Sequence, residues 1–298
     1  MIGCDLGSNT LRIVEIDCKT KKRVIEFEKI VKTGQNLKNS GKISDESIKN
    51  IFDALEEASS IFDFSSKKTK CVTTEAMRLA SNSDEILKTI KERFNLDFQI
   101  ICGDTEAQYT LQGVKNSLRL LNIPDDDFCM FDLGGGSTEI IYVQENNTSY
   151  KSFPFGILKI SEQYPDLESL QNGIYEEIEQ INYFIKGHNK PKKLIATAGT
   201  PTTVCAFLQD VDYRSYNHNK VSGKILHIND FKKAYTQILA LSLEEQERYC
   251  GTNRSELIKT GILIIIGLME KLKFEECLIV DDGLREGVAL SLCNFGFV

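Results

Sequence analysis

One pattern occurs twice in this chain and constrains its fold more than any other feature. An apolar segment runs into Asp5-Leu6-Gly7-Ser8-Asn9-Thr10, and the same order returns at Asp132-Leu133-Gly134-Gly135-Gly136-Ser137-Thr138. Each copy predicts a strand, a tight glycine turn and a second strand. Strand and helix patterns alternate along the rest of the chain, which is typical of α/β proteins. The sequence therefore predicts a duplicated α/β unit.

The hydrophobic periodicity locates the other elements and a boundary between the two copies. Strands are expected over residues 11–16, 24–31, 70–73, 98–102, 128–131, 139–143, 193–197 and 277–280. Helices are expected over 44–62, 83–94, 104–121, 167–185, 254–272 and 284–292, with a short one around Met77. Asn82 is expected to cap the helix that begins at Ser83. Because residues 122–127 break the pattern, we expect a first domain over 1–120, to which a C-terminal helix in 283–298 returns, and a second over 121–282.

Composition excludes several classes of function. The net charge of −7 argues against nucleic-acid binding, which usually requires a basic surface. The longest apolar run, 262–269, is shorter than the roughly 20 residues that cross a bilayer. The nine cysteines are scattered and never in a metal-ligand spacing. We therefore expect a cytoplasmic protein with reduced, buried thiols, without structural zinc, a disulfide framework or a membrane partner.

The repeated turn carries chemistry of its own. Glycine lets the backbone approach a ligand closely, and successive N–H groups in such a turn form a site for anions. Ser and Thr hydroxyls add donors, and the preceding aspartate can hold Mg²⁺ beside a bound phosphate. One glycine turn alone is weak evidence, but two copies at matching places in a duplicated fold favour phosphate binding.

Five stretches, in order, resemble the exopolyphosphatase/guanosine pentaphosphate phosphatase family. They are Asp5–Thr10, Thr73–Asn82, Gly103–Ala107, Asp132–Glu139 and Asp282–Gly287. This family is part of the actin, sugar kinase and Hsp70 superfamily, and Gly199–Thr203 stands where that superfamily has its third glycine motif. The resemblance covers nearly the whole chain and matches the short branch of the family. It implies an α/β fold of two actin-like, ribonuclease-H-like domains with the active site in the cleft between them, and a homodimer.

The resemblance also implies roles for individual residues. Glu106 is expected to be the general base that activates the attacking water. Asp132 and Glu139 are expected to bind Mg²⁺ and orient its water, with Asp5 as a further metal ligand, and Glu139 is thereby catalytic too. Phosphate oxygens are expected to contact Arg78 and the two turns, namely Ser8, Asn9, Thr10, Gly134, Gly135, Gly136, Ser137 and Thr138. Arg254 and Arg285 are weaker candidates, and we assign Arg285 and Glu286 mainly to support of the terminal helix.

The chain departs from the family pattern at three places that bear on the site. Cys102 stands where the family usually has Ser, Thr105 where it has an acidic residue, and Glu75 where it has Ser. These changes affect the surroundings of Arg78 and Glu106, and with them the activity expected.

The leading hypothesis is a Mg²⁺-dependent exopolyphosphatase that releases terminal orthophosphate from inorganic polyphosphate. Hydrolysis of guanosine pentaphosphate (pppGpp) is the alternative within the same chemistry, and the motifs do not separate the two. Two other classes stay open: an ATP-dependent kinase of the same superfold, which requires an adenosine pocket at Gly199-Thr200, and a non-catalytic protein that binds a phosphorylated alarmone.

Overall fold

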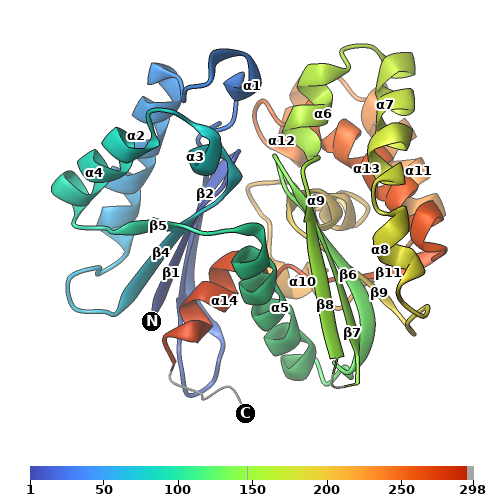
Figure 1. Ribbon diagram of the computed structural model, residues 1–298, viewed down its shortest axis with the longest axis horizontal. Coiled ribbons are helices and arrows are strands. Elements are labelled where there is room, and N and C mark those ends of the chain that lie inside the picture. The colour runs from blue at the N-terminus through green and yellow to red at the C-terminus, as the bar shows by residue number, and fades with distance from the viewer. Residues whose placement is uncertain (146, 294–298) are drawn as a thin grey trace. The chain divides into compact units, whose positions relative to one another are not determined.

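The computed structural model describes residues 1–145 and 147–293 and divides the chain into two compact units. Unit 1 contains Met1–Asn116 and the described residues from Asp282 onward, and unit 2 is Ser117–Asp281. Each unit is built around one mixed β-sheet with helices packed on it (Figure 1). None of the helices in the described part of the chain is both long and apolar enough to cross a bilayer.

The sheet of unit 1 has five strands in the order β3-β2-β1-β4-β5. Their bounds are β1 Ile2–Leu6, β2 Thr10–Ile16, β3 Arg23–Ile30, β4 Thr69–Thr73 and β5 Phe98–Ile100. The first three form an antiparallel meander, whereas β4 and β5 run parallel to β1. The carboxyl ends of β1, β4 and β5 therefore share one edge of the sheet.

Helices cover both faces of this sheet. They are α1 Leu37–Ser40, α2 Asp45–Ile61, α3 Glu75–Leu79, α4 Ser83–Phe94, α5 Gly103–Leu120 and α14 Leu284–Ser291. Helix α2 packs on the face that carries Cys4 and Leu6, together with α4, and builds the main core of the unit. Helix α14 packs on the opposite face, where Val14 and Val72 contact it. Because side chains alternate along a strand, β2 and β4 contribute to the cores on both faces of this sheet.

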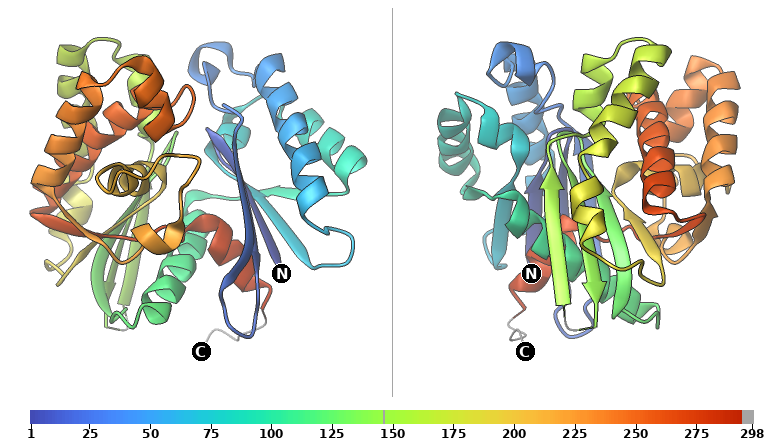
Figure 2. Two further views of the ribbon diagram at one scale, coloured as in Figure 1. Left: turned by 180° about the vertical axis from the view of Figure 1, so that it is seen from behind. Right: turned by 45° about the vertical axis from the view of Figure 1, so that its right-hand side comes forward.

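Helix α14 lies beside α5 and the strands of unit 1 (Figure 2), and its backbone comes into close contact with theirs. A Cβ added at Gly3 of β1 would lie 2.4 Å from the Arg285 carbonyl oxygen, and one at Gly287 would lie 1.7 Å from the Tyr109 carbonyl oxygen. At Gly113 of α5 the same atom would lie 2.3 Å from the Gly283 oxygen. Glycine is therefore required at these positions because backbone meets backbone there.

Buried charges fix the N-terminal end of α14. The Glu286 side chain accepts hydrogen bonds from the Gly283 N–H at 2.8 Å and from Arg285 Nε at 2.6 Å. Arg23 of β3 donates to Asp282 at 2.9 and 2.7 Å and lies 3.2 Å from Glu286. The expected supporting role of Arg285 and Glu286 has this physical basis: the two charges neutralise each other while they close the helix end.

The sheet of unit 2 has six strands in the order β10-β11-β9-β6-β7-β8. Their bounds are β6 Asp127–Leu133, β7 Thr138–Gln144, β8 Asn147–Phe153, β9 Leu194–Thr197, β10 Ile225–His227 and β11 Glu276–Ile279. Read from β8, the first five strands repeat the order and direction of the five strands of unit 1, and antiparallel β10 is added at the far edge. The predicted duplication is therefore present at the level of topology.

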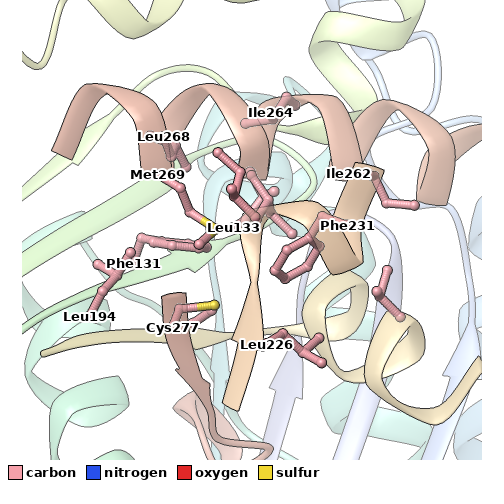
Figure 3. Packing of buried hydrophobic residues seen from close by; sticks show 14 of the residues in the cluster. Phe131, Leu133, Leu194, Leu226, Phe231, Ile262, Ile264, Leu268, Met269 and Cys277 are labelled. Carbon is pink, nitrogen blue, oxygen red and sulfur yellow. The ribbon is translucent and has the colours of Figure 1, made fainter. Parts of the chain in front are cut away.

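The core of unit 2 lies between this sheet and the long apolar helix α13. The helices of the unit are α6 Ile157–Gln163, α7 Leu167–Glu179, α8 Asn182–Lys186, α9 Gly199–Phe207, α10 His218–Val221, α11 Ile228–Ala240, α12 Leu243–Cys250 and α13 Ser255–Leu272. Figure 3 shows Ile264 and Leu268 of α13 above Phe131 of β6 and Phe231 of α11. Because α13 is apolar on most of its surface, it packs against α6, α7, α9 and α11 at once.

Several expectations about elements differ from the structure. The single helix expected over 167–185 is interrupted at Gln180 and Ile181, which separate α7 from α8. The strand expected over 98–102 ends at Ile100. Asn82 precedes α4, but its side chain does not cap that helix: it accepts from the Ile43 N–H at 3.0 Å and donates to the Ile43 carbonyl at 2.9 Å. Its amide group is thus used in a contact between segments that are distant in sequence.

The prediction that the cysteines are reduced thiols is wrong for one pair. Cys18 and Cys293 are joined by a disulfide that spans 275 residues of sequence. The other seven cysteines are free thiols, and six of those seven are buried, as expected. The pairing escaped sequence analysis because it depends on α14 returning to the first sheet, not on any local cysteine spacing.

Candidate active site

The turn between β1 and β2 has the geometry of an anion-binding loop. It is closed by the Gly7 N–H, which donates to the Thr10 carbonyl at 3.0 Å. The Ser8 carbonyl accepts from the Gly34 N–H at 2.6 Å, and the Asn9 carbonyl accepts from the two N–H groups that follow β3, at 2.9 and 3.0 Å. These two carbonyls are thus occupied, whereas no backbone carbonyl within the described residues accepts from the N–H groups of Ser8 and Asn9.

The turn between β6 and β7 repeats this arrangement. The Gly134 N–H donates to the Ser137 carbonyl at 3.0 Å, and the carbonyls of Gly134 and Gly135 accept from the first N–H groups of α6 at 3.0 and 2.8 Å. Across the part of the chain that the structure describes, no backbone carbonyl accepts from the N–H groups of Gly135, Gly136 and Ser137. Both glycine turns therefore present N–H groups that an anion can bind.

Gly156, which was not among the residues predicted from the sequence, supports the second turn. A Cβ at this position would lie 2.6 Å from the carbonyl carbon and oxygen of Gly135, so only glycine permits the approach of α6. The Thr138 hydroxyl donates to the Phe155 carbonyl at 2.7 Å and is fully buried. Thr138 therefore holds this segment behind the turn, and its hydroxyl does not take part in the N–H array. The sequence signal was present as a glycine directly before an apolar helical pattern.

Two carboxylates flank the second turn, one before it and one after it, as direct cross-strand partners. Asp132 of β6 pairs with Glu139 of β7, and side chains in such pairs lie within about 5.5 Å at Cβ. Asp132 is half-buried, whereas Glu139 is only 1% exposed and accepts a hydrogen bond from Ser152 Oγ at 2.6 Å. In unit 1 the matching pair is Asp5 and Arg12, so the paired carboxylates are specific to unit 2.

Glu106 lies in the first turn of α5, at the edge of the sheet where β1, β4 and β5 end. Thr73 Oγ1 donates to the Leu6 carbonyl at 2.7 Å, and the Ile101 N–H donates to the Thr73 carbonyl at 3.0 Å. These two bonds join the three strand ends. The turn after β1, the helix after β4 and the start of α5 are therefore brought to one edge within unit 1, as parallel strands require.

Arg78 of α3 reaches the same edge. Its Nη1 donates to the Ile101 carbonyl, and the side chain is exposed. The guanidinium group thus lies beside the start of α5 with other donors left for a ligand. Two of the departures from the family pattern meet here as well: Cys102 Sγ is 3.3 Å from Thr105 Oγ1, and this hydrogen bond lowers the pKa of the Cys102 thiol.

The family of the chain follows from comparison with known proteins. The model of the Ppx/GppA phosphatase family matches residues 13–294. The chain belongs to this family. A crystal structure of the Aquifex aeolicus Ppx/GppA family member is 27% identical, with a TM-score of 0.75 over 98% of this chain and 96% of that one. The two actin-like sheets of the expected fold are therefore confirmed.

Curated relatives of this Ppx/GppA chain differ in length and in name. Exopolyphosphatase 2 of Mycobacterium tuberculosis is 21% identical over 97% of both chains. The guanosine-5'-triphosphate,3'-diphosphate pyrophosphatase of Photobacterium profundum is 22% identical over 97% of this chain, which spans 58% of that protein. A bifunctional 3-dehydroquinate synthase/phosphatase of Fusobacterium nucleatum is 24% identical over 89% of this chain, which spans 42% of that protein.

The two remaining arginine candidates of this family member, Arg254 and Arg285, contact other side chains of the protein. Arg285 belongs to the ion pairs that fix α14. Arg254 precedes α13 in unit 2, is buried, and stacks over the Tyr213 ring with 5.2 Å between its Cζ and the ring centroid. The third glycine motif opens α9, where Thr200, Thr202 and their neighbours are buried.

No group of three or more His, Cys, Asp or Glu side chains suited to a metal ion occurs in residues 1–145 and 147–293.

Proposed function

We propose that this member of the Ppx/GppA phosphatase family hydrolyses the terminal phosphoanhydride bond of inorganic polyphosphate and releases orthophosphate. One observation carries the proposal: in each glycine turn two carbonyls accept hydrogen bonds from neighbouring segments, while successive N–H groups have no backbone acceptor among the described residues and can bind an anion. A chain of phosphates carries several anionic groups, each of which a turn of this kind can bind. The name of the M. tuberculosis relative, which matches at nearly full length, agrees with this substrate.

Glu106 acts in this proposal as the general base. A water molecule attacks the terminal phosphorus atom, Glu106 takes up its proton, and the bridging oxygen leaves with the shortened chain. Phosphoryl transfer needs a positioned nucleophile and neutralised charge more than covalent assistance. Glu106 is 8% exposed at the start of α5, where its backbone N–H donates to the Cys102 carbonyl at 3.0 Å. The carboxylate is therefore held on a rigid element close to the end of β5.

The second part of the proposal is a Mg²⁺ ion at Asp132 and Glu139. The donor set fits, because Mg²⁺ is commonly held by one or two carboxylates, with water and substrate phosphates as the other ligands. When bound, the ion neutralises charge on the phosphate oxygens. Asp132, the more exposed of the pair, would bind it, and Glu139, held by Ser152, would orient its water. Asp5 precedes the other turn and is the third proposed ligand. Arg78 would contact a phosphate from unit 1.

Hydrolysis of pppGpp is the second candidate. The name of the Photobacterium profundum relative favours it. The same bond type is broken, so the same residues would act. A nucleotide needs, in addition, contacts to a base and two ribose-linked phosphate groups.

The test is orthophosphate release by wild type, Glu106→Gln and the control Glu85→Gln. Glu85 is an exposed residue in the first turn of α4, so the control removes a similar charge from a similar helix position in the same unit. Because a general base contributes about 10²–10⁴-fold, we expect Glu106→Gln to lose at least 100-fold in kcat and Glu85→Gln to match wild type.

Each enzyme is assayed on tripolyphosphate, long-chain polyphosphate, pppGpp and ATP, with Mg²⁺ or with a chelator. Release from polyphosphate that requires Mg²⁺ supports the proposal, and faster release from pppGpp replaces it with the second candidate. Full activity of Glu106→Gln would remove the assigned base. Wild-type protein that binds these ligands but releases nothing from any of them would refute hydrolysis.

A further inference from the structure

We infer that Cys18 and Cys293 form a reversible thiol–disulfide switch that locks the C-terminal end of α14 to the sheet of unit 1. Cys18 follows β2 and is half-buried, and Cys293 lies two residues beyond α14 and is 8% exposed. The bond therefore joins the outer end of a helix to the hairpin of β2 and β3. Its place at the surface of the unit makes it accessible to small thiols.

The pattern of the other cysteines sets this pair apart. Cys4 and Cys71 are direct partners on neighbouring strands β1 and β4, yet both remain free thiols inside the core. Burial and the neighbouring thiol raise the pKa of Cys4, which makes it unreactive. Disulfides in compartments that keep thiols reduced are usually transient and redox-active, and the accessible ones are the more easily exchanged. The half-buried Cys18 matches that description.

Helix α14 has two independent anchors. Its N-terminal end is held by the ion pairs of Glu286 with Arg23 and Arg285, which do not respond to thiols. Its C-terminal end is held by the disulfide. Reduction therefore releases one end of the helix while the other stays in place, so unit 1 remains folded and α14 becomes looser over its last turns.

The loosened end lies above elements that carry the proposed site. Gly3, which lies two residues before Asp5 on β1, packs against Ala289 of α14. Gly287 packs against the Tyr109 carbonyl, one helical turn after Glu106 in α5. Movement of α14 thus reaches both β1 and α5. This last step rests on the proposed function, whereas the lock itself does not.

The chemistry is thiol–disulfide exchange with a cellular dithiol. A thiolate of the dithiol attacks Sγ of Cys18, the more exposed of the two residues, and the bond to Cys293 breaks with Cys293 leaving as a thiolate. The second thiol of the dithiol then attacks the mixed disulfide and releases the Cys18 thiolate. Two electrons pass from the dithiol to the protein, the dithiol becomes a cyclic disulfide, and the two protons it gives up appear on the new cysteine thiols.

The experiment compares the full chain before and after native reduction with dithiothreitol. Thiols are alkylated in denaturant and counted by mass, which should give seven before reduction and nine after it. We expect the melting temperature to fall by about 5–10 °C on reduction and hydrogen exchange in α14 to rise at least 10-fold, most strongly after Gly287. Cys18→Ser and Cys293→Ser should show the reduced behaviour in both conditions.

Cys102→Ser is the matched control, because Cys102 is the exposed free thiol of the same unit. It should keep the full redox response of the wild type. Nine alkylated thiols before reduction, a bond that dithiothreitol does not break in the folded chain, or equal exchange in both states would each overturn the inference. None of these readouts uses phosphate release, so a failure of the proposed function is recognised separately.

Discussion

Replacement of Gly287 by alanine tests the close packing of α14 directly. The new Cβ would lie 1.7 Å from the carbonyl oxygen of Tyr109 and 2.4 Å from its carbonyl carbon. Both are backbone atoms of α5, so no side chain can rotate away. To restore a carbon-to-oxygen distance of about 3.3 Å, the helices must separate by roughly 1.5 Å.

Two effects of this substitution oppose each other. Alanine in a helix interior is favoured over glycine by about 1 kcal/mol. Overpacking costs about 1–3 kcal/mol or more. The upper end of this range applies here because a second tight backbone contact lies in the same interface: a Cβ at Gly113 would lie only 2.3 Å from the carbonyl oxygen of Gly283. The clash therefore wins, and we expect Gly287→Ala to destabilise unit 1 by about 2 kcal/mol.

The measurement is urea unfolding followed by hydrogen exchange of α5 and α14, which separates unit 1 from unit 2. Gly187→Ala is the control, because a Cβ there meets only the Phe184 carbonyl oxygen at 3.5 Å and its φ of −79° suits alanine. We expect the control to change stability by less than about 0.5 kcal/mol. Unchanged exchange in α14 of Gly287→Ala would show that the packing argument is mistaken.

Three further predictions concern unit 1. Glu286→Gln should cost about 3 kcal/mol in the same unfolding assay, because it leaves Arg23 buried with less compensation; equal stability would contradict this. Ser44→Ala should cost about 1 kcal/mol, since Ser44 Oγ accepts the Ser47 N–H at 3.2 Å at the start of α2, and faster exchange at that N–H is the readout. Hydrogen bonds from neighbouring serines lower the pKa of Asp63 to about 2, so its stabilisation is present above its ordinary pKa and lost as pH falls through about 2. The urea midpoint of Asp63→Ala should therefore fall less steeply than that of wild type from pH 5 to pH 3, and parallel curves would refute this.

Features set by local sequence were predictable here. The turns at Gly7 and Gly134 follow from glycine, aspartate and strand patterns within ten residues, and the structure has both turns. Helix α2 was predicted within one residue at each end because its apolar spacing is regular and Ser44 caps it. Phosphate binding could be suggested from the same turns, since the N–H groups that would bind an anion belong to the turn itself.

Features set by distant contacts were not predictable. Asn82 has the residue type and the position of a helix cap, but its side-chain amide forms hydrogen bonds with the backbone of Ile43 instead. Only the folded chain brings that partner near. The disulfide of Cys18 depends on the return of α14. The role of Gly156 depends on the approach of α6 to a turn about twenty residues earlier. In each case the residue type is visible in the sequence, but the residue that it contacts is not.

The division of the first unit between both ends of the sequence has a consequence for synthesis on the ribosome. Unit 2 occupies one continuous stretch, Ser117–Asp281, and is fully made before Asp282 is added. The first sheet is made earlier but waits for α14, with Gly3 and Val14 on a face that still lacks its cover. Although it comes second in the chain, unit 2 can complete its folding first. The nascent first unit exposes an apolar surface throughout that delay, which is when a holding chaperone would protect it most.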